Sequence, residues 1–243
     1  MHLKALSIVS LLSLATAANA CLVSTSDSDA TAEDIGQDSR AIKGGSKATG
    51  YPEAVLINTK QSGQLKSACS GALVAPHVVL TAGHCVFQYD GWDITAPYAS
   101  GGQTTSANQG TTLDWKSKGG SVDPNMHDFG LIFLDQPISL ASYPKIATAP
   151  AAKGTQFINI GRINNGSLSY SELFVSKPLT VTSGDSVGFP LDYSATTVIE
   201  PGDSGGPDLA VGTHTIFAVN SRPSCNVTFS SWALSTTWLL VRT

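Results

Sequence analysis

The sequence predicts an all-β fold, a barrel or a sandwich, on two observations. The first is composition: charged residues make up 13% of the 243 residues and apolar residues 42%, with 23 glycines and 12 prolines. This balance suits a chain with many turns and strands better than a helical bundle or a disordered chain. The second is texture: beyond Arg40, short apolar runs alternate with Gly, Pro, Asn and Ser, as is typical of strands joined by turns.

The predicted strands are runs rich in β-branched or aromatic residues. They are Ala54–Ile57, Ala72–Val74, His77–Leu80, Leu131–Leu134 and Thr215–Val219. A single stretch near the end, Trp232–Val241, has the length of a useful helix. Many strands with little helix between them favour a barrel or a sandwich. The length allows one large domain or two small halves that share a core.

The N-terminal residues 1–20 have the pattern of a secretory signal peptide rather than of a buried helix. Lys4 supplies a positive charge, Ala5–Ala17 is apolar, and Ala18–Ala20 is a small-residue cleavage site. We therefore expect the protein to be secreted or periplasmic. Export also places the four cysteines in an oxidising compartment, where disulfides persist.

The segment after the predicted cleavage site has a composition that does not fold. Ser24–Asp38 is rich in Ser, Asp, Thr and Ala and cannot bury enough apolar surface. We expect residues 21–40 to be a tether or a propeptide and residues 41–243 to be the folded domain. Cys21 directly follows the cleavage site, so a lipid anchor on Cys21 stays open, although Ala18–Ala20 matches the usual lipid-attachment box poorly.

Charge and hydropathy exclude several classes of function. The net charge of −4 offers no basic patch, so nucleic acid is not an expected partner. No run of 18 apolar residues follows the first twenty positions, so no transmembrane helix is expected in the mature protein. The five histidines form no ligand-spaced set with acids or cysteines, so neither a metal nor a cofactor is expected.

The strongest local motif is Gly202–Pro207, which reads Gly-Asp-Ser-Gly-Gly-Pro. A serine between glycines can lie on a tight turn whose N–H groups point into a cleft. The N–H groups of Gly202 and Ser204 could then bind the oxyanion that forms when Ser204 attacks a carbonyl. Because a serine hydroxyl is a weak nucleophile, a base must lie nearby. A plain glycine-rich turn is the alternative, but the hexapeptide in an exported chain favours the nucleophile.

The candidate base is His84, within the motif Thr81–Cys85, which directly follows the predicted strand His77–Leu80. A strand end would hold the imidazole at a defined place. Cys69 lies 16 positions before Cys85. A disulfide between them would tie the histidine turn to the neighbouring strand, and a loop of this size contributes about 3 kcal/mol in the chain-entropy model.

The candidate orienting acid is Asp128, at the head of an apolar run that ends at Leu134. A carboxylate there will be largely buried and needs a strong partner. Donation from Nδ1 of His84 would satisfy Asp128 and would fix the tautomer that leaves Nε2 free to accept a proton. Taken alone, Asp128 would be read as a solvated acid at a strand end.

Together these residues resemble the chymotrypsin–trypsin family of serine peptidases, from about Ile42 to Leu240. The resemblance rests on Ile42–Gly45, Cys69–Gly71, Thr81–Cys85, Asp128 with its apolar run, and Gly202–Pro207. The order His, Asp, Ser is the order that this family uses. It implies two six-stranded antiparallel β-barrels, with the triad between them and a short C-terminal helix.

The resemblance also implies the activity and its residues. The chain would be a secreted serine endopeptidase that works through an acyl-enzyme, with Ser204 as nucleophile, His84 as base and Asp128 as orienting acid. It would be made as a zymogen, and the new N-terminus near Ile42 would pair with Asp203. Polypeptide substrates and protein inhibitors are the implied partners, and a monomer is expected.

Several departures from the family bear on specificity. By the resemblance, Val198 would stand at the base of the specificity pocket, and because valine cannot pair with a cation, a strict Lys or Arg preference is not expected. Glu200 replaces a cysteine of the pocket wall, which leaves Cys225 free or paired with Cys21. Arg222, near the rim, could instead attract an acidic side chain.

The alternative function is that of a catalytically silent relative that uses the same barrels as a binding module. Such relatives usually lose at least one residue of the triad, and this chain keeps all three. A serine esterase of another fold is disfavoured, because the α/β-hydrolase order places the serine first.

Overall fold

A computed structural model of the chain describes residues 45–116, 123, 125–183, 189–196, 198–224 and 227–232. All of them belong to one compact unit, Gln37–Thr243. Nearly all of the regular structure in these ranges is β-strand, and the helical element among them is a single 3-10 turn, η1 (Gly83–Cys85). The all-β expectation is therefore confirmed.

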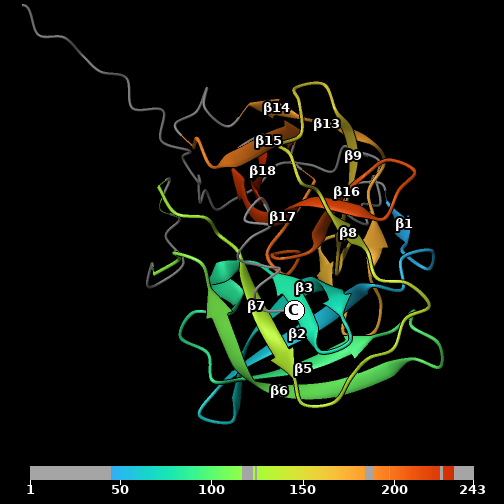
Figure 1. Ribbon diagram of the computed structural model, residues 1–243, viewed down its shortest axis with the longest axis vertical. Coiled ribbons are helices and arrows are strands. Elements are labelled where there is room, and N and C mark those ends of the chain that lie inside the picture. Colours follow the sequence, from blue (N-terminus) through green and yellow to red (C-terminus); the bar gives the residue numbers. More distant parts are fainter. Residues whose placement is uncertain are drawn as a thin grey trace, which may run out of the picture. The chain divides into compact units, whose positions relative to one another are not determined.

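Six antiparallel strands close into a barrel in the order β2-β3-β4-β7-β6-β5 (Figure 1). They are β2 (Ala54–Gln61), β3 (Gln64–Ala75), β4 (Val78–Thr81), β5 (Gly91–Ala96), β6 (Gln103–Thr112) and β7 (Gly130–Leu134). The first four predicted runs fall in β2, β3, β4 and β7. The β2–β3 hairpin turns at Ser62 and Gly63, both with positive φ, which matches the right-handed twist of paired strands.

Ten further strands form a second sheet, in the order β1-β12-β9-β16-β17-β18-β15-β14, with β13 paired to β9 and β8 paired to β17. They are β1 (Ser46–Lys47), β8 (Lys145–Ile146), β9 (Gln156–Gly161), β12 (Phe174–Val175), β13 (Leu179–Thr180), β14 (Thr182–Ser183), β15 (Asp192–Thr196), β16 (Pro207–Ala210), β17 (Thr215–Ser224) and β18 (Val227–Trp232). A separate hairpin pairs β10 (Ile163–Asn164) with β11 (Ser167–Leu168).

The pairings of the second sheet, as far as the structure describes it, do not close a second ring. The second six-stranded barrel therefore stays a prediction. The fifth predicted run, Thr215–Val219, begins β17. Trp232, the first residue of the predicted C-terminal helix, ends strand β18, and the rest of that helix lies outside the described residues.

The barrel and the second sheet share a hydrophobic cluster. Successive residues of β2 point to opposite faces of the strand. Val55 and Ile57 pack inside the barrel, whereas Leu56 joins a cluster that also contains Ile160 of β9 and Val219 of β17. Each fully buried side chain of this size stabilises the fold by about 1.5–3 kcal/mol. The shared cluster packs β4 and β7 against β16 and β17.

Candidate active site

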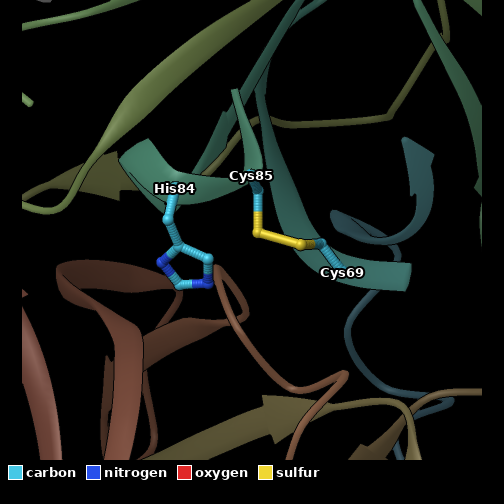
Figure 2. Close-up of side chains that lie close together, drawn as sticks. All are labelled: Cys69, His84 and Cys85. Atoms are coloured by element: carbon cyan, nitrogen blue, oxygen red, sulfur yellow. A yellow bond between two sulfur atoms is a disulfide. The ribbon is translucent and has the colours of Figure 1, made fainter. Parts of the chain in front are cut away.

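A disulfide holds the turn that carries His84. Cys69 of β3 and Cys85 of η1 are bonded, with Cα atoms 6.3 Å apart, which confirms the predicted pair. Figure 2 shows the bond beside the His84 ring. Because the turn directly follows the fully buried strand β4, both ends of the histidine segment are fixed.

Trp115 explains why glycine stands at position 83. A Cβ atom on Gly83 would lie 2.8 Å from Cβ of Trp115 and 3.2 Å from Oδ1 of Asp128. Trp115 is 1% exposed, and its ring centroid lies 6.3 Å from that of His84. Sequence reasoning missed Trp115. The available signal was the glycine at position 83, where Trp115 leaves no space for a side chain.

Asp128 is fully buried and receives hydrogen bonds from His84 and Ser221. Nδ1 of His84 lies 2.8 Å from Oδ2, the backbone N–H of His84 donates to Oδ1 at 2.9 Å, and Ser221 Oγ donates to Oδ2 at 2.6 Å. Burial raises the pKa of Asp128. The charge and hydrogen bonds of His84 and the hydrogen bond from Ser221 lower it by more, so the net pKa is lowered. The carboxylate is therefore ionised and orients the imidazole.

Opposing effects act on the pKa of His84. Burial lowers the pKa of the imidazole, the charge and hydrogen bond of Asp128 raise it, and the charge of Arg222 lowers it; the net pKa is raised. With Nδ1 donating to Asp128, Nε2 is the ring nitrogen left to accept a proton. The side chain of His84 is 26% exposed, so a ligand can reach the ring.

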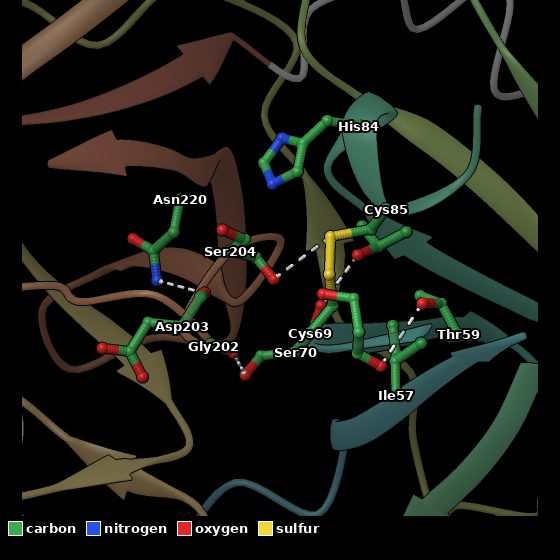
Figure 3. Close-up of a disulfide and its surroundings, with 12 residues drawn as sticks. Ile57, Thr59, Cys69, Ser70, His84, Cys85, Gly202, Asp203, Ser204 and Asn220 are labelled. Carbon is green, nitrogen blue, oxygen red and sulfur yellow. Dashed lines mark hydrogen bonds between the residues drawn. A yellow bond between two sulfur atoms is a disulfide. The ribbon is translucent and has the colours of Figure 1, made fainter. Parts of the chain in front are cut away.

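The loop that carries Ser204 docks directly on the barrel. The backbone N–H of Ser70 donates to the carbonyl of Ser204 at 2.8 Å, and Ser70 Oγ donates to the carbonyl of Gly202 at 3.0 Å (Figure 3). A Cβ atom on Gly205 would lie 2.0 Å from Thr81 Oγ1, and Gly205 has a φ of +82°. Both facts require glycine at this position.

The same loop brings Ser204 next to the histidine turn. Its carbonyl oxygen lies 3.8 Å from Sγ of Cys85, the neighbour of His84, and in Figure 3 Ser204 lies between His84 and Asp203. Within the described ranges, no hydrogen bond joins the His84 ring to Ser204 Oγ. In the same ranges, the N–H groups of Gly202 and Ser204 have no protein acceptor. Catalytic hydrogen bonds are often long in unliganded enzymes and tighten on binding.

Asp203 is fully buried behind the loop that carries Ser204. Its Oδ1 accepts the N–H of Ile163 at 2.8 Å, and its Oδ2 accepts the N–H of Glu200 at 3.0 Å. Burial raises the pKa of Asp203 to about 7, against the lowering by these donors. The predicted partner, Ile42, lies outside the described residues, so their ion pair stays a prediction.

A buried polar cluster lies beneath the loop, and sequence reasoning missed it. Asn159 Nδ2 donates to the carboxyl of Asp208 and to Asn220 Oδ1, and Asn220 Nδ2 donates to the carbonyl of Asp203 at 3.2 Å. Burial raises the pKa of Asp208 to about 7. The available signal was polar residues within otherwise apolar strands, β9, β16 and β17.

The residues expected at the specificity pocket differ in environment. Val198 is 7% exposed and belongs to an apolar cluster with Phe174 and Ile199. Glu200 is half-buried. The guanidinium of Arg222 donates to Oδ2 of Asp192 at 3.0 Å, so its charge is already balanced inside the protein.

In the described ranges, one group of three residues has side chains of the kinds that bind metals and lies close together. The candidate ligand atoms of Cys69, His84 and Cys85 lie within 4.8 Å of one another. Because the two sulfurs are bonded to each other, they are not the thiolates that a metal requires. The group is therefore the surroundings of the disulfide.

A family model described as Trypsin matches residues 42–229. The chain belongs to the trypsin family. Lectizyme of Glossina austeni is 31% identical over 137 residues, which are 54% of this chain and 48% of lectizyme. This trypsin-family chain therefore matches about half the length of that relative.

Solved structures show the same trypsin fold. Neuropsin, a serine protease expressed in the limbic system of mouse brain, superposes with a TM-score of 0.66 at 19% identity, covering 82% of this chain and 98% of neuropsin. A scabies mite inactivated protease paralogue gives 0.63 at 19% identity, covering 78% and 93% of the two chains. Among the described residues, no helix is long and apolar enough to cross a membrane.

Proposed function

We propose that this trypsin-family chain is a serine endopeptidase in which His84, Asp128 and Ser204 form the catalytic triad. The observation that carries the proposal is the hydrogen bonding of Asp128 to the backbone N–H and to the ring Nδ1 of His84, beside a glycine-flanked serine that is docked on the same barrel. This arrangement supports the roles of base, orienting acid and nucleophile that acyl transfer requires.

The proposed reaction uses the groups in sequence. Nε2 of His84 takes the proton of Ser204 Oγ as Oγ attacks the peptide carbonyl. The N–H groups of Gly202 and Ser204 bind the oxyanion, and Asp128 stabilises the imidazolium. The imidazolium then protonates the leaving amine, which leaves an acyl-enzyme. A water molecule, deprotonated by His84, releases the acid product.

The proposal extends to processing and location. The protein is exported, secreted or periplasmic, with a lipid anchor on Cys21 as the alternative. It is a monomeric zymogen in which the new N-terminus near Ile42 pairs with Asp203, and it acts on polypeptides and is open to protein inhibitors. N-terminal sequencing of the purified mature protein tests lipidation, the propeptide and activation together.

Covalent labelling tests the nucleophile. The mature protein should be labelled once by a fluorophosphonate, and Ser204→Ala should abolish labelling while leaving the fold intact. Ser139→Ala, which changes an exposed serine away from the site, is the matched control and should be labelled like the wild type. Peptide mapping should place the label on Ser204. Full labelling of Ser204→Ala would refute the assignment.

The alternative remains a catalytically silent binding protein of the same fold. The solved structure of an inactivated paralogue shares the fold, and within the described ranges no hydrogen bond joins His84 to Ser204 Oγ. Absence of labelling of the mature wild-type protein, with its N-terminus verified, would favour this alternative.

A further inference from the structure

A chain of polar contacts continues from the candidate triad into the second sheet. Ser221 Oγ donates to Oδ2 of Asp128 at 2.6 Å, and NH1 of Arg222 donates to Ser221 Oγ at 3.5 Å. The same NH1 donates to Oδ2 of Asp192 at 3.0 Å. One guanidinium nitrogen thus links the acid of the triad to a second, remote carboxylate.

The guanidinium of Arg222 is held rigidly. Its central carbon lies 3.8 Å from the centroid of the Phe189 ring, a stacking contact, and the side chains of Arg222 and Asp192 are 17% and 4% exposed. A planar guanidinium can donate in its plane and stack on a ring at once, which a lysine ammonium cannot do. Charges withdrawn from water in this way act strongly on their neighbours.

Charged groups surround both His84 and Asp192. His84 faces Asp128, which favours the imidazolium, and Arg222, which disfavours it. Asp192 faces Arg222, Asp128 and His127, and His127 itself pairs with Asp114 at 2.7 Å. Arg222 therefore opposes Asp128 in its effect on the pKa of His84. The negative charge of Asp192 reduces the effect that the positive charge of Arg222 has on His84.

We propose that Arg222, clamped by Asp192 and Phe189, is a positioning residue of the triad. It fixes Ser221 Oγ on Asp128, and its positive charge offsets part of the effect of Asp128 on the His84 imidazole. The importance of this role for catalysis rests on the proposed peptidase function. The electrostatic effect on His84 does not, so the two can be tested separately.

The direct test is an NMR titration of the His84 ring in the mature protein. Arg222→Gln should raise the pKa of His84 by about 0.5 to 1 unit, because a like charge nearby disfavours the imidazolium. Arg222→Lys should restore most of the wild-type value. Lys145→Gln, which removes an exposed cation of β8, is the control and should cause no shift. A His84 pKa in Arg222→Gln within 0.2 units of the wild type would overturn the proposal.

A second variant, Asp192→Asn, tests the same proposal if Arg222→Gln fails to fold. Asp192→Asn removes the opposing negative charge, so it should move the pKa of His84 downward. If Arg222→Gln does not fold, the downward shift of the His84 pKa in Asp192→Asn becomes the test. Its absence would overturn the proposal. In parallel, the pH profile of fluorophosphonate labelling should shift upward on its acid side in Arg222→Gln. An unlabelled wild type would defeat the proposed function, while the titration would still judge the role of Arg222.

Discussion

At the scale of single residues, Asp128 is the most constrained group of the candidate site. It is fully buried, it accepts bonds from the ring and the backbone of His84 and from Ser221, and its pKa is lowered despite burial. Two of these donors come from one residue, so the position and the orientation of the imidazole are set together. A substitution at Asp128 should therefore alter the position and the orientation of the His84 ring directly.

Asp128→Asn should reduce kcat by roughly four orders of magnitude at neutral pH, because the amide favours the wrong tautomer of His84. The substitution also removes the charge that raises the pKa of His84, so the acid limb of the pH profile should move to lower pH. Steady-state hydrolysis of a peptide substrate across pH measures both effects.

Asp114→Asn is the matched control for Asp128→Asn, because Asp114 also pairs with a histidine, His127, but away from Ser204. Its kcat should stay near that of the wild type. A near-wild-type kcat for Asp128→Asn itself would mean that another acid orients His84.

The residues that sequence reasoning found were those with local motifs. His84, Ser204 and the Cys69–Cys85 pair stand in short, recognisable patterns. The Asp192–Arg222 pair has no such pattern. It depends on two strand registers, β15 on β18 and β18 on β17, and a shift of either by one residue would separate the charges.

At the scale of elements, strands were predictable where they are apolar. The runs in β2, β3, β4 and β7 are buried and rich in Val, Leu and Ile. Strand β6 was missed, because its sequence, QTTSANQGTT, places polar side chains on an exposed barrel face. Closure of the barrel could not be predicted from the sequence of any single strand, because it depends on the pairing of β2 with both β3 and β5.

The loop before Ser204 and strand β17 predict the residue preference. Peptides with Leu, Phe, Val or Ala before the scissile bond should be cut faster than peptides with Lys or Arg. Val198 offers no carboxylate, and an unpaired cation in a buried pocket is costly. Because Asp192 already balances the charge of Arg222, a preference for acidic residues is not expected. A substrate library ranked by kcat/KM provides the measurement.

Glu200→Gln is the matched variant for this prediction. If Val198 lies at the pocket base, the ranking should be unchanged in the variant. A dominant Arg or Lys preference in the wild type that disappears in Glu200→Gln would show that Glu200 lines the pocket and that the placement of Val198 is wrong.

At the scale of the whole molecule, buried carboxyl groups in the second sheet link stability to pH. Burial raises the pKa of Asp208 to about 7, whereas an unfolded chain would show the ordinary value of 3.8. The folded state therefore holds the proton more tightly. Stability from this group is present below about pH 4 and is lost as the pH rises towards 7, with a slope of up to about 1.4 kcal/mol per pH unit.

Asp208→Asn should flatten this dependence, because an amide does not titrate. Urea unfolding at pH 5 and pH 8, in a Ser204→Ala background that prevents self-digestion, measures the difference. The wild type should lose stability between the two values, and Asp208→Asn should lose less. Asp135→Asn, at an exposed carboxylate, should behave like the parent. Equal losses in Asp208→Asn and its parent would show that Asp208 does not titrate in this range.

The docking of Gly205 against Thr81 has a consequence for the timing of synthesis. His84 and Ser204 are 120 positions apart in the sequence, and the contacts that bring them together need both. At about 5–20 residues per second, a ribosome takes about 6–24 s to pass from one to the other. Throughout that interval the nascent chain contains His84 but not Ser204. A chain cut short by a stop codon between Leu134 and Ser204 would contain all six strands of the closed barrel but would lack Ser204.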